Sequence, residues 1–345
     1  MSGELNPARI VETASAFWAS QVLVSATSLN LFTELGDEAL TAPELGKRLN
    51  LHERAWYDFF DTLVALRFLE RDGEGPQARY RNTAETAAFL NKNNPEYVGG
   101  MLEMVHDRIY PFWADLTTAL KTGEPQNEAK HLGAEAAGKL FDELYADPDR
   151  LEQFLGAMAG VSRHNFAAFA EKFDFSGHRS LCDVGGATGL LAATVAKRHP
   201  EIECATFDLP AVEPVAARSL RNWGLEGRVK VLSGDFFADP LPRADVLTMG
   251  MILHDWNLER KMTLIRKAHE ALPEGGVFVA IENLIDDARR ENAFGLMMSL
   301  NMIVETGDGF DFTGADFDGW CREAGFRRTE VMHLNGPCSA AIAYK

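Results

Sequence analysis

The sequence predicts an α/β fold, in which a Rossmann-like, mostly parallel sheet with helices on its faces follows a mostly helical domain with a winged-helix outline. Apolar residues recur at helical spacing through the first half. Past Gly177, short apolar segments alternate with helical ones, which is typical of βαβ units. The chain has 345 residues, and a single hydrophobic core rarely grows past ~250–300 residues. We therefore expect more than one domain.

Residues 1–115 are expected to form a helical dimerisation domain. Apolar residues at helical spacing predict a long first helix, and part of its apolar surface looks exposed. Such a surface fits burial against a second copy of the chain, so we expect a homodimer through the N-terminal helices. The residues that look exposed are Phe17, Trp18, Val22 and Val24.

A winged-helix pattern follows the first helix. Thr41 precedes a proline in the first turn of a helix, as helix N-caps do. The second helix of the pattern carries one arginine against three acidic residues over 52–61. A recognition helix neutralises phosphates with lysine and arginine, so the expected role is packing and not DNA binding. The expected elements are helices at 41–50 and 52–66 and strands at 68–71 and 80–81.

Residues 116–175 are expected to form a helical connector and part of a substrate-pocket wall, and residues 176–345 the catalytic sheet. Five strands alternate with helices and should therefore run parallel. Two segments near the C-terminal end lie close together in the chain and should pair antiparallel at one edge. The parallel strands are expected at 180–184, 203–207, 229–232, 245–249 and 277–281, and the antiparallel pair at 330–333 and 340–343.

Composition argues against several classes of partner. The chain has 51 acidic and 34 basic residues and a net charge of −17, which repels nucleic-acid phosphates and anionic membranes. No stretch has the length and apolar character of a membrane span or a signal peptide. The four cysteines form no CxxC pair, which argues against a zinc or redox site and favours a reducing cytoplasm. We expect no metal, nucleic acid or membrane partner.

A glycine-rich turn, Asp-Val-Gly-Gly-Ala-Thr-Gly over 183–189, joins a buried strand to a helix. Glycines at such a turn let a ligand approach the backbone, and the helix N-terminus adds N–H donors. A nucleotide-like ligand is therefore expected. Ala187 and Leu190 break the GxGxxG pattern of dinucleotide binding, which weakens the alternative of an NAD-dependent oxidoreductase.

Acidic residues follow the next two strands. Asp208 comes nineteen residues after Gly189, where a carboxylate in this architecture accepts ribose hydroxyls. Asp235 can accept from an adenine amine while Phe236 covers the ring face. Open α/β sheets bind ligands at the carboxyl ends of their strands, so these turns should form one site.

These motifs make the sequence similar to class I S-adenosylmethionine-dependent methyltransferases, in particular to the small-molecule O-methyltransferases of the caffeate and hydroxyindole type and their bacterial natural-product relatives. The resemblance covers essentially the whole chain. It implies that S-adenosylmethionine is the cofactor, with its methionine part at Asp183, its ribose at Asp208 and its adenine at Asp235. The cofactor-binding residues that it implies are Asp183, Gly185, Gly186, Gly189, Asp208, Leu209, Gly234, Asp235, Phe236 and Trp256.

A second motif, Leu-His-Asp-Trp over 253–256, follows the fourth strand. A histidine there suits proton transfer at neutral pH, since its ordinary pKa is about 6.5. By resemblance to the family, His254 takes the proton of an acceptor hydroxyl in line with the methyl-sulfonium group, and Glu282 and Asp311 flank it. A carboxylate on the far ring nitrogen would fix the tautomer and stabilise the imidazolium.

The sequence departs from the family pattern at several positions. Ala187 stands where a glycine is usual, and Gly250 where plant enzymes often carry a lysine beside the adenine. Asp311 replaces a glutamate with a shorter arm, and Phe310 and Phe312 replace two basic residues. We therefore expect a narrower cofactor loop and a shorter reach from Asp311 to the imidazole.

Two segments resemble the family's substrate-pocket walls. Methionine and aromatic residues at helical spacing over 101–113 and 296–302 suit a planar or apolar acceptor, although such residues are more often plain core. His106 and Arg108 suit an anionic group, and Asn301 either orients a substrate hydroxyl or caps a buried carbonyl. The candidate substrate residues are Met104, His106, Arg108, Met158, Met298, Asn301 and Met302.

The leading hypothesis is a cytoplasmic, homodimeric methyltransferase that moves a methyl group from S-adenosylmethionine to a hydroxyl of a small aromatic or polyketide-type acceptor. A member of the same family that methylates carbon, nitrogen or sulfur is the first alternative. An NAD-dependent oxidoreductase and a winged-helix DNA-binding regulator are the alternatives of other classes.

Overall fold

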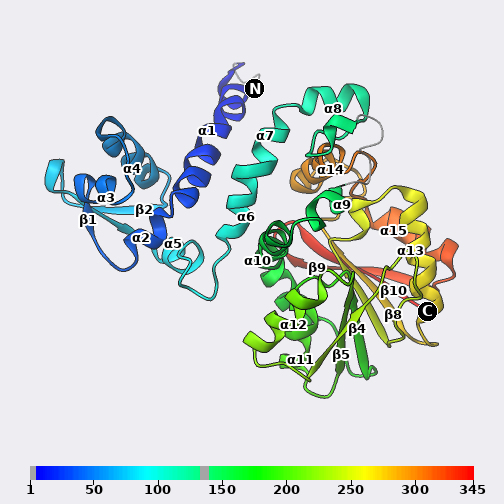
Figure 1. The fold of residues 1–345 in the computed structure, drawn as a ribbon. Coiled ribbons are helices and arrows are strands. Elements are labelled where there is room, and N and C mark those ends of the chain that lie inside the picture. Colours follow the sequence, from blue (N-terminus) through cyan, green and yellow to red (C-terminus); the bar gives the residue numbers. More distant parts are fainter. Residues whose placement is uncertain (1–4, 133–139) are drawn as a thin grey trace. The chain divides into compact units, whose positions relative to one another are not determined.

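The computed structural model describes residues 5–132 and 140–345 (Figure 1). The chain divides into two compact units, Met1–Pro111 and Phe112–Lys345. The helical connector expected at 116–175 belongs to the second unit, and its residues 133–139 lie outside the described residues.

The first unit combines helices with a small antiparallel sheet. The strands lie in the order β1-β3-β2, so the expected hairpin gains a third strand from the residues before α3. Thr41 caps α3, because its hydroxyl accepts from the backbone N–H of Glu44 and its own N–H donates to the Glu44 carboxylate. The elements are α1 (Ala8–Ser28), α2 (Leu31–Leu35), β1 (Leu40–Thr41), α3 (Ala42–Arg48), η1 (Glu53–Ala55), α4 (Trp56–Ala65), β2 (Leu69–Asp72), η2 (Gly75–Gln77), β3 (Arg79–Asn82), α5 (Ala84–Phe89), α6 (Gly99–Met104), η3 (Val105–Ile109) and α7 (Tyr110–Trp113), in which the boundary falls.

Helix α1 exposes apolar residues along its N-terminal part. Phe17 and Trp18 are 53% and 65% exposed, and Ile10 is exposed as well. The expectation that Val24 shares this surface is wrong, because Val24 is buried and Val22 is partly buried. The C-terminal part of α1 packs within the first unit against α2 and α4, so the exposed apolar surface is confined to the N-terminal part.

A seven-stranded sheet in the order β6-β5-β4-β7-β8-β10-β9 forms the centre of the second unit. Strands β4 to β8 are parallel, and β10 pairs antiparallel with both β8 and β9. The expected Rossmann-like arrangement with an antiparallel edge is confirmed. The strands are β4 (Ser180–Val184), β5 (Glu203–Asp208), β6 (Val229–Ser233), β7 (Val246–Gly250), β8 (Val277–Glu282), β9 (Arg328–Asn335) and β10 (Cys338–Tyr344).

Helices cover both faces of the sheet (Figure 1). Along β8, Val279 and Ile281 join the core shared with α10 and α11, whereas Phe278 and Ala280 join the core shared with α13 and α15. Every residue of β8 is buried, as expected of a strand enclosed on both faces. The helices are α8 (Leu116–Thr122), α9 (Leu140–Tyr145), α10 (Pro148–Lys172), α11 (Leu190–Arg198), α12 (Glu213–Asn222), η5 (Leu253–Asp255), α13 (Leu258–Ala271), α14 (Ala293–Glu305) and α15 (Gly314–Ala324).

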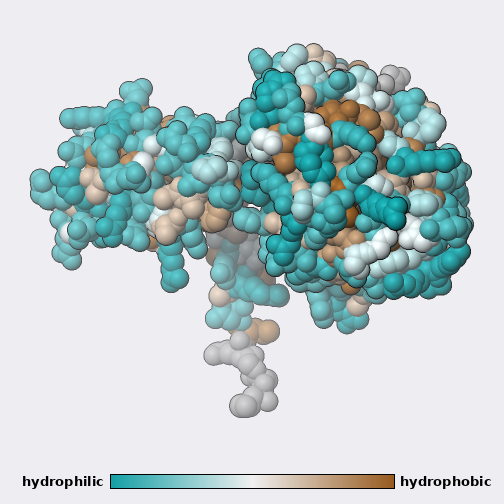
Figure 2. All heavy atoms as spheres, turned by 90° about the horizontal axis from the view of Figure 1, so that it is seen from below, coloured by the Kyte–Doolittle hydropathy of each residue, from teal (hydrophilic) through white to brown (hydrophobic). Residues whose placement is uncertain are grey.

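Hydrophilic residues cover most of the face drawn in Figure 2, with hydrophobic patches between them. Among the described residues, no helix combines the length and apolar character that crossing a bilayer requires. The four cysteines are free and buried. Burial raises the pKa of Cys204 to about 11 and that of Cys338 to about 12, so both stay protonated thiols at neutral pH.

Candidate active site

The turns that follow β4, β5, β7 and β8 lie along one edge of the sheet, because these parallel strands end on the same side. This edge carries the glycine-rich turn after β4, Asp208 at the end of β5, His254 after β7 and Glu282 at the end of β8. The residues that the sequence assigns to a cofactor and to catalysis are therefore neighbours in the fold.

The glycine-rich turn combines left-handed backbone angles with close packing. Gly185 and Gly189 have positive φ angles of 71° and 78°, and a Cβ at Gly186 would lie 2.1 Å from Oγ1 of Thr206. These positions require glycine. Ala187 also has a positive φ, of 50°, a conformation that costs an L-residue about 1–2 kcal/mol. The departure at Ala187 therefore places strain in the turn.

Two carboxylates lie beside this turn. Buried Asp183 accepts a hydrogen bond from Oγ1 of Thr248 at 2.7 Å. Asp208 accepts from the backbone N–H groups of Ala187 at 2.8 Å and Leu209 at 2.7 Å. Burial raises the pKa of Asp183 to about 7 and that of Asp208 to about 6, although the hydrogen bonds oppose it. A ligand that brings hydroxyl donors or a positive charge would favour the ionised forms.

Aromatic rings form the neighbouring wall. The rings of Phe237 and Trp256 meet edge to face at 4.8 Å, and Phe236 and Phe237 do so at 4.9 Å. Asp235 accepts from the backbone N–H of Phe237 at 2.7 Å, which fixes the turn that contains Gly234. Nε1 of Trp256 is buried and has no hydrogen-bond partner in the part of the chain that the structure describes. A planar ligand with polar edges fits such a wall.

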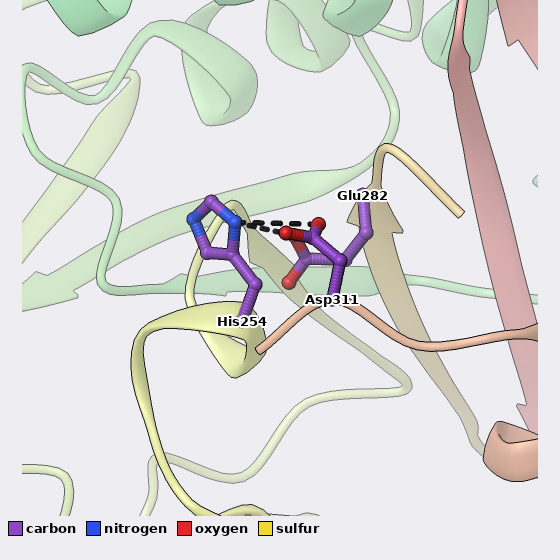
Figure 3. Close-up of side chains that lie close together, drawn as sticks. All are labelled: His254, Glu282 and Asp311. Atoms are coloured by element: carbon purple, nitrogen blue, oxygen red, sulfur yellow. Dashed lines mark ion pairs between the residues drawn. The ribbon is translucent and has the colours of Figure 1, made fainter. Parts of the chain in front are cut away.

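His254, Glu282 and Asp311 meet in one buried cluster (Figure 3). Asp311 reaches it from the segment between α14 and α15. Nδ1 of His254 lies 3.5 Å from Oδ1 of Asp311 and 3.9 Å from Oε2 of Glu282. Nε2 points away from both acids and lies 3.5 Å from Oδ1 of Asp255. The structure thus brings the three candidate catalytic residues together, with a gap to Asp311 that is longer than an ordinary hydrogen bond.

The electrostatics of the cluster favour a protonated histidine. Burial lowers the pKa of His254, but the carboxylates of Glu282, Asp255 and Asp311 outweigh it and raise the pKa to about 10. Burial raises the pKa of Glu282 to about 7, and its Oε1 accepts from the backbone N–H groups of residues 252 and 253. The cluster therefore stabilises an imidazolium, which is what a base becomes when it accepts a proton.

The same donors also suit a metal ion. One nitrogen of His254 and one oxygen each of Glu282 and Asp311 lie within 4.8 Å of one another, and these are ligand types that zinc accepts. A proton and a metal ion on Nδ1 exclude each other. If the expectation of a metal-free enzyme is right, chelators should leave the activity unchanged.

Comparison with known proteins decides the family. The O-methyltransferase domain matches residues 113–327, and the O-methyltransferase dimerisation domain matches residues 11–92. The chain belongs to the O-methyltransferase family. This result favours methyl transfer over the chemistry of an NAD-dependent oxidoreductase.

Relatives of this O-methyltransferase match it along nearly the whole chain. The tetracenomycin polyketide synthesis 8-O-methyl transferase TcmO of Streptomyces glaucescens is 38% identical over 98% of this chain and 97% of its own. The N,N-dimethyltransferase OxyT of Streptomyces rimosus is 37% identical over 94% of this chain and 92% of its own. The crystal structure of human N-acetylserotonin methyltransferase with S-adenosylmethionine has a TM-score of 0.90 at 28% identity, and the match covers 100% of this chain and 99% of that one.

The candidate substrate residues of this O-methyltransferase fall in both units. The Oδ1 of Asn301 accepts from the indole Nε1 of Trp113 at 2.7 Å. In the second unit Met302 is buried, and Met158 and Met298 are half-buried. In the first unit Met104 is buried. His106 and Arg108 lie in the π-helical turn η3 and are half-buried. The role of all seven in substrate binding stays a prediction.

Sequence reasoning missed two polar residues of the O-methyltransferase site. Thr248 lies in the buried part of β7, where nothing in the apolar pattern marks it as a partner of Asp183. Lys261 lies on the apolar face of α13, one turn before Ile265 and two before Ala268. A lysine at a helical position that should be apolar was a signal that could have identified it.

Proposed function

We propose that this O-methyltransferase moves a methyl group from S-adenosylmethionine to a hydroxyl of a small aromatic acceptor, with His254 as the general base. The observation that carries the proposal is the orientation of the buried imidazole. Its Nδ1 faces Glu282 and Asp311, and its Nε2 points away from them. A ring held in this way has Nε2 left to receive a proton.

The carboxyl edge of the sheet fits the cofactor. Asp208 would hold the ribose hydroxyls, Asp235 with Phe236 the adenine, and the glycine-rich turn with Asp183 the methionine part, as the resemblance implies. The unpartnered indole nitrogen of Trp256 and the raised pKa of Asp183 support a polar, positively charged ligand here. When bound, S-adenosylmethionine supplies a methyl group on a positively charged sulfur.

Nε2 of His254 would take the proton of the acceptor hydroxyl as the acceptor oxygen replaces the sulfur on the methyl carbon, so that the carbon–sulfur bond breaks as the carbon–oxygen bond forms. A phenol with a pKa of about 10 is a poor nucleophile until that proton is transferred. Glu282 and Asp311 stabilise the charge that the ring gains. A positive charge bound nearby would lower the pKa of His254 and so favour the neutral ring that a base requires.

The relatives support the acceptor class and the assembly that we propose. TcmO is a transferase of polyketide synthesis, so an aromatic polyketide is the acceptor class that we propose. The match of residues 11–92 to a dimerisation domain, together with the exposed Phe17 and Trp18, supports a homodimer through the first unit. A cytoplasmic location is part of the same proposal.

The test is methyl transfer from labelled S-adenosylmethionine to a panel of phenolic polyketides by the wild type and by His254→Ala. We expect the variant to lose about 10²–10⁴-fold in turnover, the usual contribution of a general base. Thermal stabilisation by S-adenosylhomocysteine should stay, because His254 is not assigned to the cofactor. Full activity in the variant would refute the role of His254.

A second candidate is methylation of an amine, because OxyT, an N,N-dimethyltransferase, is 37% identical over nearly the whole chain. Amine and phenol acceptors of matched ring size distinguish the two reactions. A product that carries N-methyl groups, or turnover that survives His254→Ala, would favour this candidate.

A further inference from the structure

Lys261 is a buried charged residue to which the proposed mechanism assigns no role. It lies on α13 and is 0% exposed. Placing an ammonium group out of water is unfavourable unless other groups compensate. The groups that surround Lys261 therefore indicate its role.

The ammonium group of Lys261 lies between the two segments that carry the catalytic cluster. Nζ donates a hydrogen bond to the backbone carbonyl of Trp256, two residues after His254. On its other side Nζ lies 3.6 Å from the ring centroid of Phe310, which immediately precedes Asp311. A cation over an aromatic face is attracted by the ring, and more strongly when water is excluded. One side chain thus ties the His254 segment to the Asp311 segment.

The backbones of the two segments also pack closely against each other. A Cβ at Gly309 would lie 2.6 Å from the carbonyl oxygen of His254 and 2.7 Å from that of Asp255. Nearby, Nδ2 of Asn257 donates to Oδ2 of Asp308 at 2.7 Å. The position of Asp311 relative to the imidazole therefore depends on how tightly this short segment is held.

The charge of Lys261 also balances the acids around it. Burial lowers its pKa to about 8, and Glu282, Asp255, Asp311 and Asp308 oppose this through their charges. In return, Lys261 lowers the pKa values of Glu282 and Asp255, which burial raises to about 7 and about 6. The other titratable groups that act on Glu282 are His254, Asp311 and Asp255 and, from β10, the neutral thiol of Cys338.

We propose that Lys261 is a positioning residue of the active site, whose ammonium group holds the Asp311 segment against the His254 segment and offsets part of the negative charge of the acids around it. It would do so in a chain where Phe310 and Phe312 stand in place of the two basic residues of the family pattern. The inference rests on the proposed function for its effect on turnover, but not for its effect on the carboxylates.

The test compares Lys261→Met with Lys261→Gln, which keeps a donor for the Trp256 carbonyl, and with Lys172→Met as the matched control. Nζ of Lys172 donates to the carbonyls of His333 and Leu334 at 2.9 and 2.8 Å, away from the catalytic cluster. Without the charge of Lys261, the acidic limb of the turnover–pH profile should move up by about one pH unit, because Glu282 then binds its proton more tightly. The KM for S-adenosylmethionine and the profile of Lys172→Met should not change.

A second readout does not need activity. Carbon NMR of glutamate labelled at the side-chain carboxyl, with Glu282 assigned by Glu282→Gln, gives the pKa of Glu282 directly. We expect it to rise in Lys261→Met and Lys261→Gln. If the wild type methylates no phenol, the proposed function fails and this titration still decides the role of Lys261. An unchanged pKa and an unchanged acidic limb in whichever variant folds would overturn the inference.

Discussion

Asp311 and Nδ1 of His254 lie 3.5 Å apart, and both carboxylate oxygens of Asp311 are buried with no hydrogen-bond partner in the described part of the chain. A buried carboxylate without hydrogen bonds costs free energy unless a nearby positive charge stabilises it. The charge that it faces is the imidazolium of His254, the state formed when the acceptor loses its proton. We infer that Asp311 acts through its negative charge more than through the geometry of one hydrogen bond.

Replacing that charge gives a direct test. Asp311→Asn keeps the size of the side chain but removes its charge, so turnover should fall by at least about tenfold, since one pKa unit on His254 corresponds to that factor. Asp311→Glu restores the longer arm of the family pattern and should stay close to the wild type. Turnover at saturating cofactor measures both, with stabilisation by S-adenosylhomocysteine as the control. Equal turnover in Asp311→Asn and the wild type would contradict the electrostatic role.

Ala187 is another residue at which the chain departs from the family pattern, and its effect can be measured as the free energy of unfolding. Its left-handed backbone costs about 1–2 kcal/mol, whereas glycine costs about 0.5–1 kcal/mol in lost chain entropy. Ala187→Gly should therefore raise the free energy of unfolding by about 0.5–1 kcal/mol in urea. Ala167→Gly, on the exposed side of α10, should lower it, since that position is helical. A loss of stability in Ala187→Gly would contradict the strain.

The sequence predicted those residues of the site that lie together in a short motif. The glycine-rich turn and the Leu-His-Asp-Trp segment each lie at the end of one strand, so their place in the fold follows from that strand. The partners of Asn301 and Lys261 could not be predicted in this way. Trp113 is 188 positions from Asn301, and Phe310 comes from a segment distant from α13, so only the folded chain pairs them.

Periodicity predicted the inner strands β4 and β8 because nearly all of their residues are buried and each reads as an apolar run. Periodicity did not predict two other features. Strand β1 has two residues, too few for any pattern, and Val24 looked exposed because one helix cannot show which of its turns will be covered. Contacts with other elements decide both, and those contacts are not local in sequence.

The approach of the Asp311 segment to η5 is an element-scale feature that a single methyl group can disturb. Gly309→Ala would place a Cβ within 2.7 Å of two carbonyl oxygens of η5, so the segment and Asp311 must move away from His254. We expect turnover to fall while stabilisation by S-adenosylhomocysteine stays. Gly319→Ala in α15, where an added Cβ meets nothing within 4 Å, is the matched control and should leave turnover unchanged. Equal turnover in the two variants would show that the close approach is not needed.

At the scale of the whole molecule, the net charge of −17 and the exposed apolar part of α1 point to different partners. The acidic surface repels polyanions, whereas the apolar part of α1 favours association with another protein surface. It lies within the residues that match a dimerisation domain. In a homodimer the same patch contributes from both copies, so one substitution changes the interface twice.

Trp18→Glu should therefore convert a dimer to a monomer in size-exclusion chromatography with light scattering. Trp18 is 65% exposed within its own chain, so the fold and its circular dichroism should be unchanged. Loss of an interface tryptophan typically costs at least about 2 kcal/mol, which is a factor of about 30 in the dissociation constant, and a buried glutamate adds to that. Val331→Glu, at a 52% exposed apolar residue of the edge strand β9, is the control and should stay dimeric. If Trp18→Glu stays dimeric at micromolar concentration, α1 is not the interface and the homodimer must form through another surface.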